Sequence, residues 1–95
     1  MKTIYKYLVP QQTKFELEIP RGSKFLTLQK QNNSQAIWFE VDTEEKKMRI
    51  KFEIYGTGWN LNSSMDKQYL GTFVDGAYVW HLYAKEYKFN AERYD

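Results

Sequence analysis

The chain has 95 residues, a formal net charge of +2 and no cysteine. This length fits one domain with one hydrophobic core, and the small net charge argues against a dedicated binder of duplex nucleic acid. The absence of cysteine favours a reducing compartment. No stretch of about 20 apolar residues is available for a membrane span, so we expect a cytoplasmic protein.

Alternation of apolar and polar residues predicts a succession of short strands. They are expected at residues 4–9, 15–19, 25–30, 37–41, 48–54, 69–73 and 77–83. Pro10 and Pro20 end the first two, since proline cannot donate a hydrogen bond to a neighbouring strand. Leu26 and Leu28 are expected on one face of the third strand. Seven strands without a helical pattern predict an all-β domain, either an antiparallel sandwich or a partly open barrel.

Turn residues indicate which strands are neighbours. Asn32-Asn33-Ser34 and Asp75-Gly76 each predict a tight turn between two apolar runs. We also predict a hairpin between strands 37–41 and 48–54, joined by the charged segment 42–47.

Two strands also have an expected position in the sheet. The strand at 77–83 is apolar on both faces, which is typical of a central strand, whereas the first strand, with Tyr5 and Tyr7, is expected at a sheet edge. Residues 1–84 are predicted to form the domain. Residues 85–95 are predicted as a C-terminal extension, either a short helix or a tail.

The longest strand runs directly into the segment Tyr55-Gly56-Thr57-Gly58-Trp59. Its glycines permit positive φ and a close backbone approach, but it lacks the Lys-Ser/Thr ending of a P-loop. Amide groups, a hydroxyl and two aromatic rings are parts that hold a nucleotide-like ligand. The alternative is a bulge at a sheet corner. The other candidate ligand-binding residues, aromatic or polar, are Trp38, Tyr69, Thr72, Trp80 and His81.

The sequence contains no recognisable catalytic or metal-binding set. His81 is the only histidine, so a metal cluster or a Ser-His-Asp arrangement cannot be assembled, and a structural role is favoured over acid–base chemistry. Outward-facing strand positions carry Glu16, Glu18, Glu40 and Glu53, which are expected to be solvated. We therefore predict a protein that is not an enzyme and that needs no cofactor.

A basic set lies along the outer face of the longest strand and consists of Lys46, Lys47, Arg49 and Lys51. With the neighbouring aromatic rings it could hold a single strand of nucleic acid. Because Glu44, Glu45 and Glu53 interrupt it, an ordinary solvated face is the favoured interpretation.

Several ordered motifs resemble a family of short, uncharacterised proteins of tailed phages and prophages. They are Met1-Lys2-Thr3-Ile4-Tyr5-Lys6-Tyr7, Ile37-Trp38, Val41-Asp42, Ile54-Tyr55-Gly56-Thr57-Gly58, Tyr69-Leu70-Gly71-Thr72-Phe73 and Val79-Trp80-His81. Trp59 stands where many members have a histidine, and residues 84–95 look like an addition. The resemblance implies a phage accessory protein without supplying an activity.

We expect such a protein to act by binding. The first hypothesis is counter-defence through sequestration of a small nucleotide-derived ligand. The second is inhibition of a host protein through a sheet edge or an aromatic patch, and the third is a virion-associated structural module. A homo-oligomer is expected, because a domain this small gains buried surface by associating.

Overall fold

The computed structural model describes residues 1–61 and 66–90. Its regular elements are seven strands, and no helix occurs within these two ranges. The strands are β1 (Lys2–Leu8), β2 (Lys14–Pro20), β3 (Lys24–Gln31), β4 (Ser34–Asp42), β5 (Lys47–Gly56), β6 (Lys67–Asp75) and β7 (Tyr78–Lys85). The predicted all-β fold with seven strands is confirmed, and the described ranges contain no helix that could cross a membrane.

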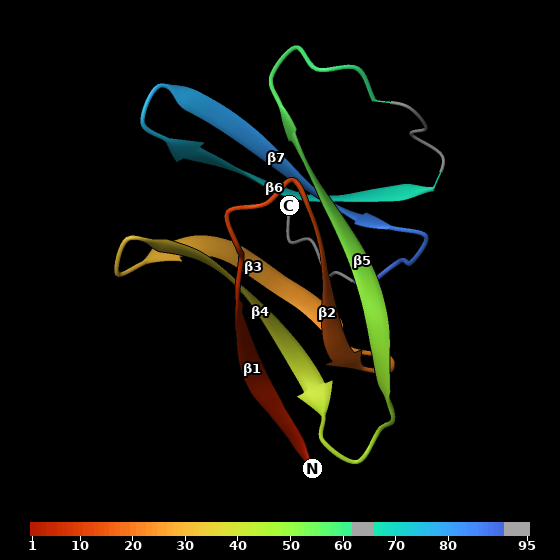
Figure 1. Ribbon diagram of the computed structural model, residues 1–95. Coiled ribbons are helices and arrows are strands. Elements are labelled where there is room, and N and C mark those ends of the chain that lie inside the picture. The colour runs from red at the N-terminus through yellow and green to blue at the C-terminus, as the bar shows by residue number, and fades with distance from the viewer. Residues whose placement is uncertain (62–65, 91–95) are drawn as a thin grey trace, which may run out of the picture.

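The strands form two antiparallel sheets that enclose one core, an open sandwich instead of a closed barrel (Figure 1). One sheet has three strands in the order β1-β4-β3, and the other has four in the order β2-β5-β7-β6. The first strand lies at a sheet edge and β7 lies between β5 and β6, as the sequence predicts. The tips of the β3–β4 and β6–β7 hairpins lie at the same side of the molecule, at the left of Figure 1.

The core lies where the apolar faces of the two sheets meet. Alternate residues of β4 and β5 supply half of its buried cluster, because alternation turns every second side chain inward. The buried members are Ile37, Phe39 and Val41 of β4, and Ile50, Phe52 and Ile54 of β5. Aromatic side chains each bury about 150–250 Å², so a few rings supply much of this apolar contact.

Both turn predictions are confirmed. Asn32 and Asn33 have φ angles of 50° and 67°, the left-handed values that a two-residue hairpin turn requires, and they connect β3 to β4. Gly76, with φ of 60°, does the same between β6 and β7.

The predicted hairpin between residues 37–41 and 48–54 is wrong. β4 pairs with β1 and β3, and β5 pairs with β2 and β7, so the connection between them crosses from one sheet to the other. Both edges of each strand are therefore occupied by other strands. The strongly apolar faces of β4 and β5 meet across the core instead of lying side by side in one sheet, and each face buries the other.

Leu26 and Leu28 do not share a face, contrary to the prediction. A bulge between Phe25 and Thr27 shifts the register of β3 against β4. Since one extra residue reverses the alternation, Leu28 packs on the core while Leu26 is exposed. Leu28 in turn lies against β6: a Cβ atom on Gly71 would be 2.9 Å from its Cδ2 atom.

The described part of the C-terminal extension lies on the core. Phe89 is buried, and its ring lies 4.7 Å from that of Phe39 and 6.2 Å from that of Phe52, measured between centroids. Gln68 fixes the backbone of Phe89 with two hydrogen bonds: its Nε2 donates to the carbonyl and its Oε1 accepts from the N–H. Residues 91–95 of the predicted extension lie outside the described residues.

Candidate functional site

The structure divides the candidate ligand-binding residues among three places. Trp59 and Trp80 lie at one end of the core. The outer face of the four-stranded sheet carries Tyr55, Thr57, Tyr69, Thr72 and His81. Trp38 alternates with the buried Phe39 and therefore lies on the outer face of the other sheet. The sequence motifs thus do not converge on one site.

The glycine segment after β5 folds Trp59 back onto its own strand. The Trp59 N–H donates to the Gly56 carbonyl at 3.1 Å, and Gly58 has φ of 87°. A Cβ atom on Gly56 would lie 2.7 Å from Trp59 Nε1, so only glycine permits this approach. Trp59 is 52% exposed, and its ring meets that of Trp80 edge to face, with ring centroids 5.5 Å apart.

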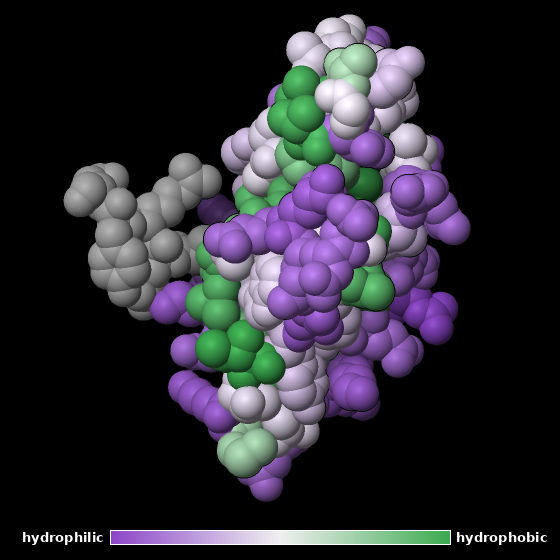
Figure 2. Space-filling model, turned by 90° about the vertical axis from the view of Figure 1, so that its left-hand side faces the viewer, coloured by the Kyte–Doolittle hydropathy of each residue, from purple (hydrophilic) through white to green (hydrophobic). Residues whose placement is uncertain are grey.

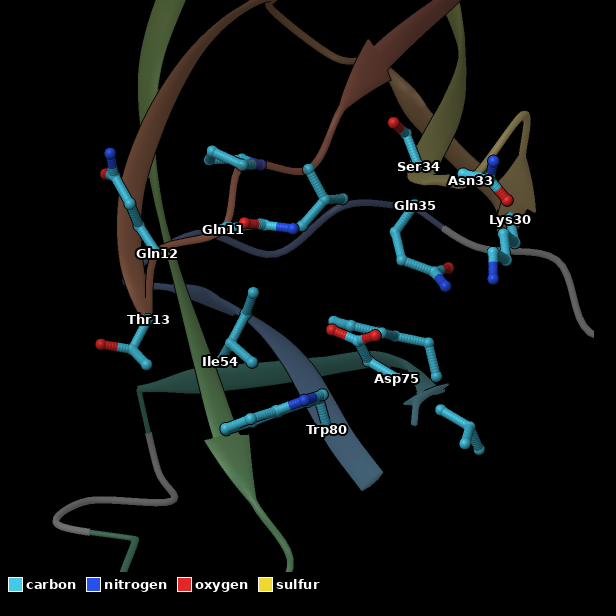
Figure 3. A pocket seen from close by; sticks show the side chains of 14 residues that line it. Gln11, Gln12, Thr13, Lys30, Asn33, Ser34, Gln35, Ile54, Asp75 and Trp80 are labelled. Carbon is cyan, nitrogen blue, oxygen red and sulfur yellow. The ribbon is translucent and has the colours of Figure 1, made fainter. Parts of the chain in front are cut away.

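Trp80 also lines a cleft of about 370 Å³ that opens between the two sheets (Figure 3). The apolar lining includes Val9, Ile54, Phe73 and Trp80, which lie toward the core, and the exposed Val74. The polar lining comes from the β1–β2 connection and from the β3–β4 hairpin, and it consists of Gln11, Gln12, Thr13, Asn33, Ser34 and Gln35. Several segments that are distant in sequence therefore build one recess.

Among the described residues, the rim of this cleft carries one charge of each sign. Lys30 comes from the β3–β4 hairpin and Asp75 from the β6–β7 hairpin, and both are exposed. Figure 2 looks at the side of the molecule that carries these hairpin tips, where apolar residues in green adjoin polar residues in purple. Such a mixed surface can accept a ligand that has both a ring and hydrogen-bonding groups.

A second, more open hollow lies between the edges of β3 and β6. Tyr69 is the candidate ligand-binding residue that lines it, beside Leu28, Gly71 and Phe89. Fewer polar side chains line this hollow than line the Trp80 cleft, and no indole ring lines it. We therefore regard the Trp80 cleft as the better ligand site.

His81 is held between two hydroxyl groups on the outer face of the four-stranded sheet. Thr57 Oγ1 lies 2.9 Å from its Nε2, and Thr72 Oγ1 lies 2.9 Å from its Nδ1. Tyr69 completes the chain with a hydrogen bond to the Thr72 hydroxyl. With both ring nitrogens occupied, the geometry agrees with a structural role in which His81 anchors the glycine loop through Thr57.

The prediction that Glu53 is solvated is wrong. The residue is only 6% exposed, and its Oε1 lies 2.6 Å from Lys67 Nζ, whose side chain is 5% exposed. Three tyrosine rings stand beside this pair: Tyr55 and Tyr69 each meet Tyr83 edge to face. A period-two pattern indicates on which face of a strand a side chain lies, but not whether other side chains cover that face. No signal in the sequence therefore identified the pair of Glu53 and Lys67.

The buried pair perturbs the titration of its members. Burial alone would raise the pKa of Glu53, but hydrogen bonds from Lys67 and Tyr55 outweigh it and lower the pKa below its usual value. The Glu53 hydrogen bond raises the pKa of Lys67, against the opposing effect of burial. Burial, followed by the hydrogen bond to Glu53, raises the pKa of Tyr55. The pair is therefore charged on both sides at neutral pH.

Two of the four residues in the basic set at the start of β5, Arg49 and Lys51, lie beside carboxylates. Arg49 lies 3.7 Å from Glu16 and 3.8 Å from Glu18, and Lys51 lies 3.9 Å from Glu86. The side chains of all four basic residues are exposed. This arrangement agrees with a solvated face. No group of three metal-binding side chains occurs in the part of the chain that the structure describes.

The chain belongs to the family described as a domain of unknown function, DUF7352, whose model matches residues 1–93. The match includes the segment after β7, in agreement with the burial of Phe89 in the core. Searches of the curated proteins and of the solved structures each gave no significant match.

Proposed function

We propose that this member of the DUF7352 family is a non-enzymatic binding protein for a small ligand with one planar, base-like ring, held in the Trp80 cleft. One observation carries the proposal: an indole ring and several amide and hydroxyl side chains share a recess of about 370 Å³. Small-molecule sites have volumes of about 300–1,000 Å³, an apolar lining and a few polar groups that orient the ligand.

Trp80 supports this proposal as a pre-formed stacking surface. It lies within β7, paired with Gly56 of β5 on one side and Phe73 of β6 on the other. Trp59 packs against its ring at right angles. A rigid ring loses little conformational entropy on binding, and stacking on a base contributes about 1–3 kcal/mol.

The polar lining supports a ligand with a hydrogen-bonding edge. Each glutamine amide offers both donors and an acceptor, which is what the edge of a nucleobase requires. Figure 3 shows the side chains of Gln11 and Gln35 across the cleft from Trp80. A ring stacked on Trp80 would meet these amides at its margin.

The charges at the rim limit the size of the ligand. Lys30 is the cationic side chain among the cleft residues, and Asp75 carries the opposite charge. One lysine matches at most one phosphate group, so we propose a nucleoside or a mononucleotide in preference to a polyphosphate. In a phage accessory protein, which the sequence resemblance suggests, binding without turnover would serve to sequester a host signal in counter-defence.

Ligand binding can be tested with thermal-shift and tryptophan-fluorescence titrations against nucleobases, nucleosides, mononucleotides and cyclic dinucleotides. We expect a nucleoside or a mononucleotide to raise the melting temperature and to quench fluorescence. Trp80→Leu should abolish both responses. Trp38→Leu is the matched control, because Trp38 lies on the outer face of the other sheet. No response to any compound at millimolar concentration contradicts the proposal.

A second variant separates stacking from edge recognition. Gln35→Leu removes an amide from the cleft and leaves the Trp80 ring in place. We expect it to reduce the preference for one base over another by about tenfold, since a lost hydrogen bond costs about 1 kcal/mol or more. Equal losses for all bases would indicate that the amide shapes the cleft without reading the ligand.

A further inference from the structure

The outward edge of β1 offers a row of free backbone groups. β1 pairs with β4 on one side only, and no strand in the described ranges lies on its other side. Two backbone hydrogen bonds flank the paired residues: Val9 N–H donates to the Gln35 carbonyl, and Thr43 N–H donates to the Met1 carbonyl. They show which residues of β1 direct their backbone groups toward β4. Odd-numbered residues therefore bond to β4, and the N–H and C=O groups of Lys2, Ile4, Lys6 and Leu8 point outward.

The side chains of the same residues alternate in character. Ile4 is 60% exposed and Leu8 is 57% exposed, and the exposed Lys2 and Lys6 lie between and beside them. Two large apolar side chains on an unpaired edge form a surface that favours strand pairing, whereas lysines usually oppose it. The partner of this edge must therefore keep the lysines away from other positive charges.

We propose that β1 pairs in antiparallel fashion with β1 of a second copy of this chain, with the twofold axis at Tyr5. In this register Lys2 lies opposite Leu8, and Ile4 lies opposite Lys6. The aliphatic stem of each lysine then covers an apolar side chain while its ammonium group stays in water. The two three-stranded sheets become one continuous sheet.

The neighbouring registers place like charges together. A shift of two residues in one direction puts Lys2 opposite Lys6, and a shift in the other direction puts Lys6 opposite Lys6. Like charges directly opposite each other destabilise a strand pair. The sequence of β1 is therefore self-complementary in one register, which is what a twofold interface requires.

The other edges of the two sheets are less suited to such pairing. The edge row of β2 includes Pro20, which has no N–H to donate. The β3 and β6 edges face each other, with Leu28 packed against Gly71. Among the described strands, β1 thus presents an edge that faces no other strand and has an N–H group at every outward position.

Single cysteine substitutions test the register directly, because the chain has no cysteine of its own. Tyr5→Cys would place the two thiols at a non-hydrogen-bonded pair, with Cα atoms about 4.5 Å apart, within the range of a disulfide. We expect this variant to form a disulfide-linked dimer under mild oxidation. Ile4→Cys and Lys6→Cys are matched controls that would cross-link only in the two shifted registers.

Two variants of Ile4 that introduce opposite charges test the same interface without cross-linking. In sedimentation experiments we expect the unmodified chain to dimerise as its concentration rises. Ile4→Lys should weaken the dimer at least tenfold, because it faces Lys6, whereas Ile4→Glu should preserve it. Circular dichroism confirms that each variant is folded.

Three results would overturn the proposal. One is a chain that stays monomeric at every concentration, and another is preferential cross-linking of Ile4→Cys or Lys6→Cys. The third is a monomer whose β1 amides become protected from hydrogen exchange only when an acidic peptide is added, which would assign the edge to a foreign strand.

Discussion

Lys67 Nζ lies 2.6 Å from Glu53 Oε1 on the outer face of a sheet, yet neither side chain is more than a tenth exposed. Tyr55 donates a second hydrogen bond to the same carboxylate oxygen at 2.8 Å, and Lys85 Nζ lies 3.9 Å from the other oxygen. The carboxylate is thus satisfied without water. This pair joins β5 to β6 across the intervening strand β7.

Removal of one partner leaves an uncompensated buried charge. We predict that Lys67→Met lowers the free energy of unfolding by about 3 kcal/mol. Adding Glu53→Gln to this variant should recover at least half of the loss, because the charge is removed and the acceptor for Tyr55 remains. Urea denaturation measures both values. Lys51→Met, which breaks the exposed pair with Glu86, is the control and should cost less than about 1 kcal/mol.

The same pair makes stability depend on pH in a defined window. Glu53 has a lowered pKa, so its contribution is present above the unfolded value of about 4.3 and is lost as the pH falls through the folded value. Lys67 has a raised pKa, so its contribution is present below about 10.4 and is lost as the pH rises through the folded value.

The difference in unfolding free energy between the unmodified chain and Glu53→Gln should therefore be largest between these limits. We predict that it shrinks below about pH 4 and above about pH 10. Denaturant unfolding across this pH range provides the measurement. A difference that does not change with pH would show that the pair contributes nothing electrostatic.

Gly56→Ala should displace Trp59 without unfolding the domain. The new methyl group would meet the indole at 2.7 Å, and the half-exposed ring has room to move away. We predict a loss of the near-ultraviolet circular dichroism that arises from the Trp59–Trp80 contact, with a stability change of less than about 1 kcal/mol. In a Trp59→Leu background, the same substitution should have no further spectral effect.

Gly71→Ala tests the contact between β6 and β3. The added methyl group would lie 2.9 Å from Leu28 Cδ2 and 3.3 Å from its Cβ, so the chain is overpacked at this point. We predict a loss of about 1–2 kcal/mol in the free energy of unfolding. A double-mutant cycle with Leu28→Ala should show that most of this loss disappears once Leu28 is shortened. Additive effects would place the strain elsewhere.

Phe89→Ala tests whether the segment after β7 is part of the core. The ring contacts Phe39 and Phe52 and is fully buried, so we predict a loss of about 3–4 kcal/mol. Lys88→Ala, at the exposed neighbouring position, should leave the unfolding free energy nearly unchanged. Thermal or urea unfolding of the two variants gives the comparison, and equal values would show that the segment docks without stabilising the fold.

Local features of the chain were sufficient to predict the strands and two of the turns. Alternation marks a strand with two unlike faces, and Asn32, Asn33 and Gly76 adopt left-handed conformations that most residues avoid. For the same reason the glycines around Thr57 indicated a sharp change of direction before Trp59. These are properties of a few adjacent residues, so they can be inferred from the sequence alone.

Contacts between distant segments could be decided only by the tertiary structure. Alternation shows that β4 and β5 each have an apolar face, but not that those faces meet across the core instead of lying in one sheet. It assigned Glu53 to the outer side of β5, but not to a buried position beside Lys67. The cleft at Trp80 likewise depends on three connections that meet in space. A strand's pattern encodes its two faces, whereas its neighbours are selected by packing of the whole chain.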